Sequence, residues 1–85
     1  MILRVVDASW AGGTRLRLAF NDGQRKVVDV APLLEGPVFE PLRAEASFSQ
    51  VRLDPICGMV VWPNGADLAP EALESLPALE RPAVA

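Results

Sequence analysis

The sequence contains no histidine and a single cysteine, and each shortage excludes a class of site. Without histidine the chain lacks the commonest general base and the commonest metal ligand. The lone Cys57 cannot form an internal disulfide, and one cysteine without histidine cannot complete a structural zinc site. We therefore expect no cofactor, no metal and no catalytic residue, and we interpret Cys57 as a packing or loop residue.

Long apolar runs and an excess of positive charge are also missing. The longest apolar run, from Met59 to Trp62, is far shorter than the roughly 20 residues that span a bilayer. The N-terminus lacks the cationic start and long apolar core of a signal peptide, so we expect a cytoplasmic protein with no membrane contact. Eight basic residues face eleven acidic ones, for a net charge of −3. This balance suits a basic protein partner better than a nucleic-acid backbone.

The residues that are present predict one small α+β domain. The chain has 85 residues, of which 51% are hydrophobic. Apolar alternation predicts an antiparallel sheet of about five strands with two hairpins. Short helices are expected between the third and fourth strands, and one more helix at the C-terminal end. We assign residues 1–76 to this domain and 77–85 to a flexible tail. The strands are expected at residues 2–9, 14–20, 24–30, 50–54 and 59–62, and the helices at 31–34, 38–43 and 70–76.

The second hairpin has a loop whose length follows from side-chain pairing. A two-residue turn at Asp22 and Gly23 would place Leu16 opposite Asp29 and turn a carboxylate into the core. A three-residue loop with a left-handed Gly23 places Leu16 opposite Val28 instead. Burying a polar group without a hydrogen-bond partner costs on the order of 2–7 kcal/mol, and an unpaired carboxylate costs several kcal/mol at least. The second register is therefore preferred.

The segment from Gly58 to Leu73 is the most informative part of the chain. Its strand ends at Trp62-Pro63, Asn64-Gly65 forms a turn, and Pro70 takes the first helical position. Leu68 and Leu73 have the spacing of a hydrophobic staple. Trp62 is either a core residue or, if its indole edge is exposed, an anchor for a protein partner.

Carboxylates are the remaining candidates for chemistry. Asp54, Asp67 and Glu71 lie around the final strand, turn and helix, where paired acids can serve acid–base catalysis or hold a hard cation. Their spacing matches no calcium loop. The simpler interpretation is that Asp67 accepts backbone N–H groups of its own turn or of the helix start.

Together these segments resemble a small bacterial family, domain-of-unknown-function family 2442 (DUF2442), from about Leu3 to Leu76. The segment W-P-N-G-x-D-L-x-P-E is the most specific part of the match. The resemblance also rests on Phe20-Asn21-Asp22-Gly23, Val28-Asp29-Val30, Phe48 with Val51, and Val61 through Glu71 with Leu73.

The resemblance implies an α+β fold and a gene neighbourhood often shared with another small uncharacterised protein, a pairing proposed to be a toxin–antitoxin system. This chain would be the antitoxin-like, single-domain member. Some relatives continue into a DNA-binding helix-turn-helix, whereas this chain continues into a Pro/Ala-rich segment, so we do not expect it to bind nucleic acid alone.

The leading hypothesis is a non-enzymatic module that binds a small, basic, toxin-like protein. Edge strands and the rim formed by Trp62, Pro63, Asn64 and Asp67 would supply the surface. A ligand-binding or hydrolase-like domain using Asp54, Asp67 and Glu71 is the second hypothesis, and a self-associating homodimer is the third. We expect Asp22, Gly23, Gly65, Leu68, Pro70 and Leu73 to serve turns and caps.

Overall fold

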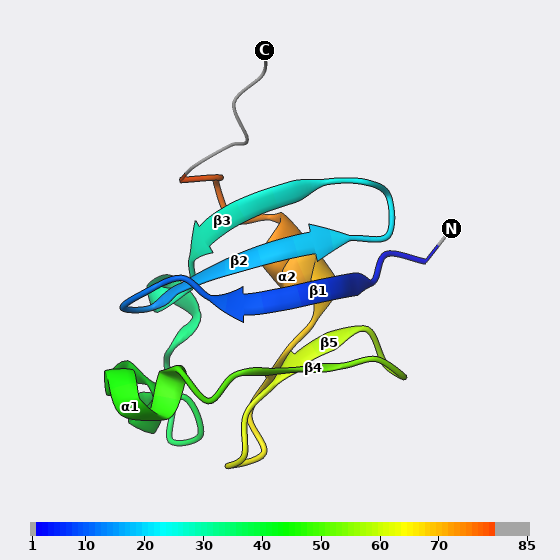
Figure 1. Cartoon of the computed structure of the whole chain (residues 1–85). Helices are drawn as coiled ribbons and strands as arrows, with labels where there is room; N and C mark the ends of the chain where they lie inside the picture. The colour runs from blue at the N-terminus through cyan, green and yellow to red at the C-terminus, as the bar shows by residue number, and fades with distance from the viewer. Residues whose placement is uncertain (1, 80–85) are drawn as a thin grey trace.

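The chain folds into two three-stranded antiparallel sheets joined by short helices (Figure 1). The structure is a computed structural model and describes residues 2–79. Sheet A has the order β1-β2-β3 and sheet B the order β4-β5-β6. The α+β class is as predicted. The strands are β1 (Val5–Trp10), β2 (Arg15–Phe20), β3 (Arg25–Asp29), β4 (Arg52–Asp54), β5 (Met59–Val61) and β6 (Asp67–Leu68).

The helices are short and lie where the chain passes between or beyond the sheets. Three of them connect β3 to β4, and α2 follows β6. Their bounds are η1 (Ala31–Leu33), η2 (Glu40–Arg43), α1 (Glu45–Phe48) and α2 (Pro70–Glu74). None of the helices within residues 2–79 has the length and apolar character that a membrane crossing requires.

The prediction of a single sheet of about five strands is wrong, because β1 is an edge strand rather than an interior one. β1 lies against β4 and β5, but the register of β1 shifts between Val5 and Asp7, where a bulge interrupts the pairing. The bond from the Val5 N–H to the Gly58 carbonyl, 2.9 Å, joins β1 to the β4–β5 turn. Only Val5 of β1 is buried, whereas Val6 and Ile2 on the other face are exposed, so the apolar residues on both faces do not indicate a central position.

Sheet A has the register that the carboxylate argument predicted. Leu16 pairs with Val28, and Arg15 pairs with Asp29. The loop spans residues 21–23, and Gly23 has a φ of 94°. Asp29 stays out of the core, where it accepts a hydrogen bond from the Thr14 hydroxyl at 2.7 Å and one from the Ala31 N–H at 2.9 Å.

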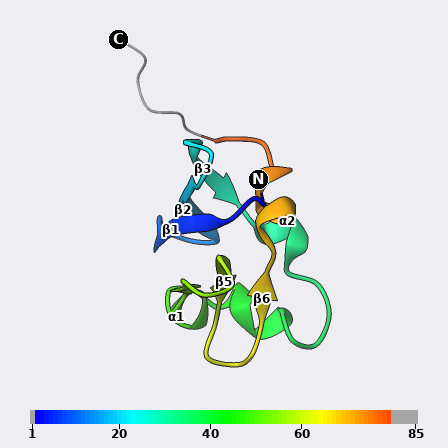
Figure 2. The same cartoon turned by 90° about the vertical axis from the view of Figure 1, so that its right-hand side faces the viewer.

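The core lies between the inner faces of the two sheets, with the helices closing its sides (Figure 2). Strand β2 supplies alternate residues, Leu16, Leu18 and Phe20, because side chains alternate across a strand, and β1 and β3 add Val5 and Val28. Phe48 of α1 and Leu73 of α2 are fully buried within it. The core comprises Val5, Leu16, Leu18, Phe20, Val28, Val30, Leu34, Leu42, Phe48, Val60, Trp62, Ala66, Leu68 and Leu73.

The chain after α2 returns to sheet A. Helix α2 ends at Glu74, two residues earlier than predicted, and Lys26 donates to the carbonyls of Glu74 and Leu76 beyond that end. Cations are favourable there because the last carbonyls of a helix carry partial negative charge. The Leu79 N–H then bonds to the Val27 carbonyl of β3 at 2.8 Å. The predicted tail thus begins against β3, and its residues 80–85 lie outside the described part.

Candidate functional site

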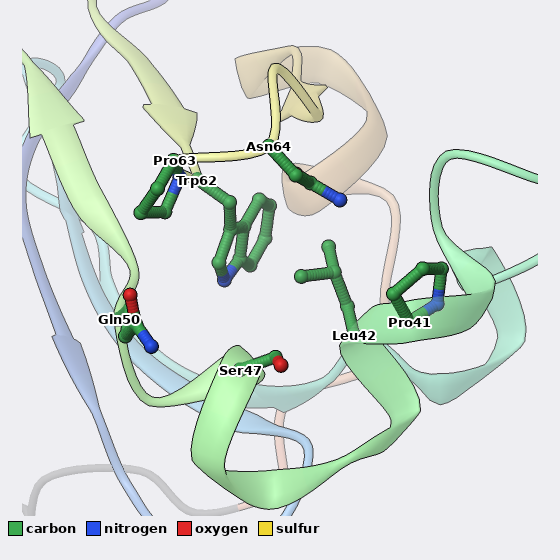
Figure 3. A pocket seen from close by; sticks show the side chains of 7 residues that line it. All are labelled: Pro41, Leu42, Ser47, Gln50, Trp62, Pro63 and Asn64. Carbon is green, nitrogen blue, oxygen red and sulfur yellow. The ribbon is translucent and has the colours of Figure 1, made fainter.

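A small hollow of about 120 Å³ opens beside the β5–β6 turn. In Figure 3 the indole of Trp62 lies at its centre, facing Leu42 of η2, and Asn64 lies across its upper side. Pro63, Asn64 and Pro41 are exposed, while Trp62 and Leu42 are buried. The hollow therefore has an apolar floor and an exposed rim. Its lining residues are Pro41, Leu42, Ser47, Gln50, Trp62, Pro63 and Asn64.

Trp62 is a core residue, and only 4% of its surface is exposed. Its indole N–H donates to the Phe48 carbonyl at 2.9 Å, and the two rings lie 5.5 Å apart between centroids. This pairing satisfies the single polar atom of the indole inside the core, as buried polar groups require. Trp62 therefore reaches a partner only through the floor of the hollow.

Asn64 fixes the rim of the hollow by using both ends of its amide. Its Oδ1 accepts a hydrogen bond from the Ala66 N–H, and its Nδ2 donates to the Val38 carbonyl, each at 3.0 Å. The first bond closes the turn before β6, and the second ties that turn to the segment between η1 and η2. The assignment of amide oxygen and nitrogen follows from these two partners.

The structure does not bring Asp67 to the hollow. Asp67 pairs with Val61, and the buried pair Val60 and Leu68 lies next to it along the strands. Because side chains alternate along a strand, Asp67 projects from the face of sheet B opposite to Trp62. The interpretation that Asp67 accepts backbone N–H groups is wrong within residues 2–79. Asn64 has that role instead.

The three candidate carboxylates do not converge. Asp54 accepts hydrogen bonds from the Cys57 and Ile56 N–H groups, at 3.2 and 3.0 Å, and these bonds lower its pKa below 3.8. It pairs with Met59, so the strand spacings place its Cα about 12 Å from that of Asp67. Glu71 lies in the first turn of α2. Within residues 2–79, acidic and sulfur side chains form no cluster that could hold a metal ion.

The turn and cap residues hold the framework around this site. Asp22 accepts hydrogen bonds from the backbone and side chain of Gln24, which lower its pKa. Pro70 is buried at the start of α2, and the N-cap residue Ala69 supplies no side-chain hydrogen bond to the helix. Leu68 and Leu73 both belong to the core. The Gly65 N–H bonds to the Trp62 carbonyl within the β5–β6 turn.

Four lining residues escaped the sequence analysis: Pro41, Leu42, Ser47 and Gln50. The sequence pattern predicts a helix at residues 38–43, but it does not predict the short α1, which follows that helix and contains Phe48. Nothing local in the sequence indicates that this connection folds over the β5–β6 turn.

The comparisons with known proteins agree with the family resemblance. The family model described as "Protein of unknown function (DUF2442)" matches residues 5–76, which covers all the strands and helices. The search of curated proteins and the search of solved structures gave no match. Because the family model covers most of the sequence, this chain belongs to the DUF2442 family.

Proposed function

We propose that the chain is a non-enzymatic protein-binding module, antitoxin-like in role, that receives one side chain of a small basic protein in the hollow beside Trp62. The observation that carries this proposal is the hollow itself, with its apolar floor and exposed rim. A volume of about 120 Å³ suits a single side chain and is well below the 300–1,000 Å³ of ordinary small-molecule sites.

Shape and rigidity support the same role. The rim is fixed by the Asn64 bonds to Ala66 and Val38, so little conformational freedom is lost when a partner docks. Exposed Val38 lies beside this rim and extends the apolar area around it. Such an arrangement resembles the pocket and anchor of a binding hot spot, where one inserted side chain supplies much of the affinity.

Charge favours a basic partner. The net charge is −3, and Glu40 is exposed next to Pro41 at the rim. Arg43 of the same helix donates its Nε–H to the Leu34 carbonyl, so its charge is drawn toward the body of the protein. A positively charged partner would therefore be steered toward this side by long-range attraction.

The test is to fill the hollow. Gln50→Trp places a large side chain in the lining, and Gln24→Trp makes the same change at the exposed β2–β3 loop. The tagged chain would be purified from its native host under mild conditions, and the bound proteins quantified by mass spectrometry. We expect one small basic protein in a near-equal ratio with the unaltered chain and with Gln24→Trp, and its loss with Gln50→Trp. Recovery of the chain alone, or equal binding by both variants, contradicts the proposal.

A further inference from the structure

A second surface, on the outer face of sheet A, has the opposite charge. Arg15, Arg17 and Arg25 are exposed there, because Leu16 and Leu18 between them point into the core. Other basic side chains of the chain bind carbonyl groups instead: Arg4 binds the β4–β5 turn, and Lys26 the end of α2. Three exposed arginines thus share one sheet face with Asp29, which pairs with Arg15, and with Asp7, which pairs with Ala19, so this face has a small positive excess in a protein whose net charge is negative.

The outer edge of β3, beside this face, has backbone groups that do not bond to β2. Hydrogen bonds join Val30 to Thr14 and Phe20 to Gln24, and bonded pairs alternate in an antiparallel ladder. The N–H and C=O groups of Arg25, Val27 and Asp29 therefore point away from β2. In Figure 1 β3 is the strand of sheet A farthest from sheet B, at the edge where the chain after α2 passes.

The Val27 carbonyl at this edge already accepts a hydrogen bond from the backbone of the chain after α2. The Leu79 N–H donates to the Val27 carbonyl at 2.8 Å, as a neighbouring strand would. Yet Leu79 is 53% exposed and lies outside the core, so little apolar burial holds it there. The edge is thus compatible with an added strand, and its present occupant is weakly held.

Beside this contact the outer face has an open hollow of about 470 Å³, lined by Ala11, Arg15, Arg17, Val27 and Leu79. Arg15 lies opposite Asp29 of β3, whereas Arg17 lies opposite the uncharged Val27. Two guanidinium groups against this single carboxylate favour a further carboxylate, because arginine binds it through charge-assisted hydrogen bonds. A strand placed along β3 would direct alternate side chains over this face.

We propose that the β3 edge binds an extended acidic segment of a partner protein as an added strand, with one carboxylate between Arg15 and Arg17 and with residues 77–79 displaced. Backbone bonds to Arg25 and Val27 supply the docking, and the arginines supply the preference for acidic side chains. This surface lies on the outer face of sheet A and is independent of the hollow beside Trp62, so either proposal can fail alone.

The probe is a fluorescent octapeptide of alternating valine and glutamate, compared with a valine–lysine octapeptide and with a proline-interrupted version of the first. Binding would be measured by anisotropy, and the amides of Arg25 and Val27 followed by hydrogen exchange in NMR. We expect the acidic peptide alone to bind, to protect both amides, and to weaken as salt rises.

Two variant pairs locate the contact. Arg15→Gln combined with Arg17→Gln should raise the peptide Kd about tenfold, whereas Arg52→Gln, which changes an exposed arginine of sheet B, should leave it unchanged. Leu79→Pro removes the N–H that bonds to Val27 and should lower the Kd severalfold relative to Leu79→Ala, which keeps it.

Each contrary outcome overturns the proposal. These outcomes are no binding at millimolar peptide, equal binding of the lysine or proline peptide, and equal Kd values within either variant pair. Preferential binding of a DNA duplex over the acidic peptide would reassign the arginine face to a phosphate backbone and overturn it as well.

Discussion

Sheets A and B are held together in different ways. The strands of sheet A have six, six and five residues, and paired backbone groups join them along their length. The strands of sheet B have three, three and two residues. Such short strands make few ladder bonds, so sheet B depends on side chains that bind the backbone of other segments. Trp62 binds Phe48, Asn64 binds Val38, and Arg4 binds Ile56.

This difference explains why the most recognisable segment of the sequence lies in sheet B. A backbone ladder forms with many sequences, whereas a bond from an indole or amide to a distant carbonyl needs one residue type at one position. Within W-P-N-G-x-D-L-x-P-E, Trp62 and Asn64 each make such a bond, Leu68 belongs to the core, and Pro70 is buried at the start of α2. Asp67 is the exception, because it is exposed and its carboxylate has no hydrogen bond within residues 2–79.

The largest effect is expected from Trp62→Phe. Phenylalanine lacks the indole N–H, so the buried Phe48 carbonyl keeps only its bond from the Val51 N–H, and the core loses volume. The free energy of unfolding should fall by about 2–3 kcal/mol, measured by urea denaturation.

Trp10→Phe is the matched control in sheet A. The Trp10 indole N–H donates to the Gly13 carbonyl at 3.0 Å, but 40% of the side chain is exposed, so water can replace that bond. Trp10→Phe should therefore lower the free energy of unfolding by less than about 1 kcal/mol. Equal losses for the two variants would contradict the view that sheet B depends more on its side chains.

Gly58→Ala should act at the junction of the two sheets. Gly58 has a φ of 67°, and an added Cβ would lie 2.7 Å from the Arg4 Cβ. Backbone strain and this collision together should cost about 2 kcal/mol of unfolding free energy. Gly36→Ala has a similar φ of 88° with nothing within 4 Å, so it isolates the strain at about 1 kcal/mol. If Gly58→Ala lowers the free energy of unfolding no more than Gly36→Ala does, the Arg4 side chain moves away from the added Cβ without loss of stability.

Asn64→Ala and Asn21→Ala compare the same loss in the two sheets. Each amide makes two bonds to the backbone: Asn64 to Ala66 and Val38, and Asn21 to Arg4 and Ile2. Asn64→Ala should cost about 1–2 kcal/mol, measured by thermal and urea unfolding. Asn21→Ala should cost less, because the bond from the Asn21 N–H to the Arg4 carbonyl remains. A larger loss of stability for Asn21→Ala than for Asn64→Ala would contradict the view that sheet B depends more on its side chains.

Sheet A was predictable from sequence because its information is local. Alternation placed β2 and β3, and the cost of burying Asp29 chose the register of Leu16 opposite Val28. The separation into two sheets was not predictable, because it depends on how β1 meets β4 and β5, which are distant in sequence. Strand β6 has two residues, too few for any alternation to appear.

The candidate site was predicted only in part, for the same reason. Trp62, Pro63 and Asn64 are adjacent in sequence and do line one hollow. Asp67 was grouped with them by proximity, although one step along a strand turns a side chain to the opposite face. The far wall, Ser47 and Gln50, comes from a connection whose position is set by the burial of Phe48.

The smallest effect is expected from Asp29→Asn, which tests how little sheet A depends on one side chain. The Thr14 hydroxyl and the Ala31 N–H bind the Asp29 carboxylate and lower its pKa below 3.8. A depressed folded pKa stabilises the protein above the unfolded pKa of about 3.9, and this stabilisation is lost as the pH falls through the folded value. Above pH 5 the free energy of unfolding of the unaltered chain should exceed that of Asp29→Asn by less than about 1 kcal/mol, because the carboxylate is only partly buried. Thermal unfolding from pH 7 to pH 2 should show this gap narrowing once the pH falls below the unfolded pKa and closing as the pH falls through the lower folded pKa of Asp29, where the carboxyl becomes neutral like asparagine. A gap that stays constant to pH 2 would mean that the charge of Asp29 contributes nothing, and that the backbone ladder alone holds this edge of sheet A.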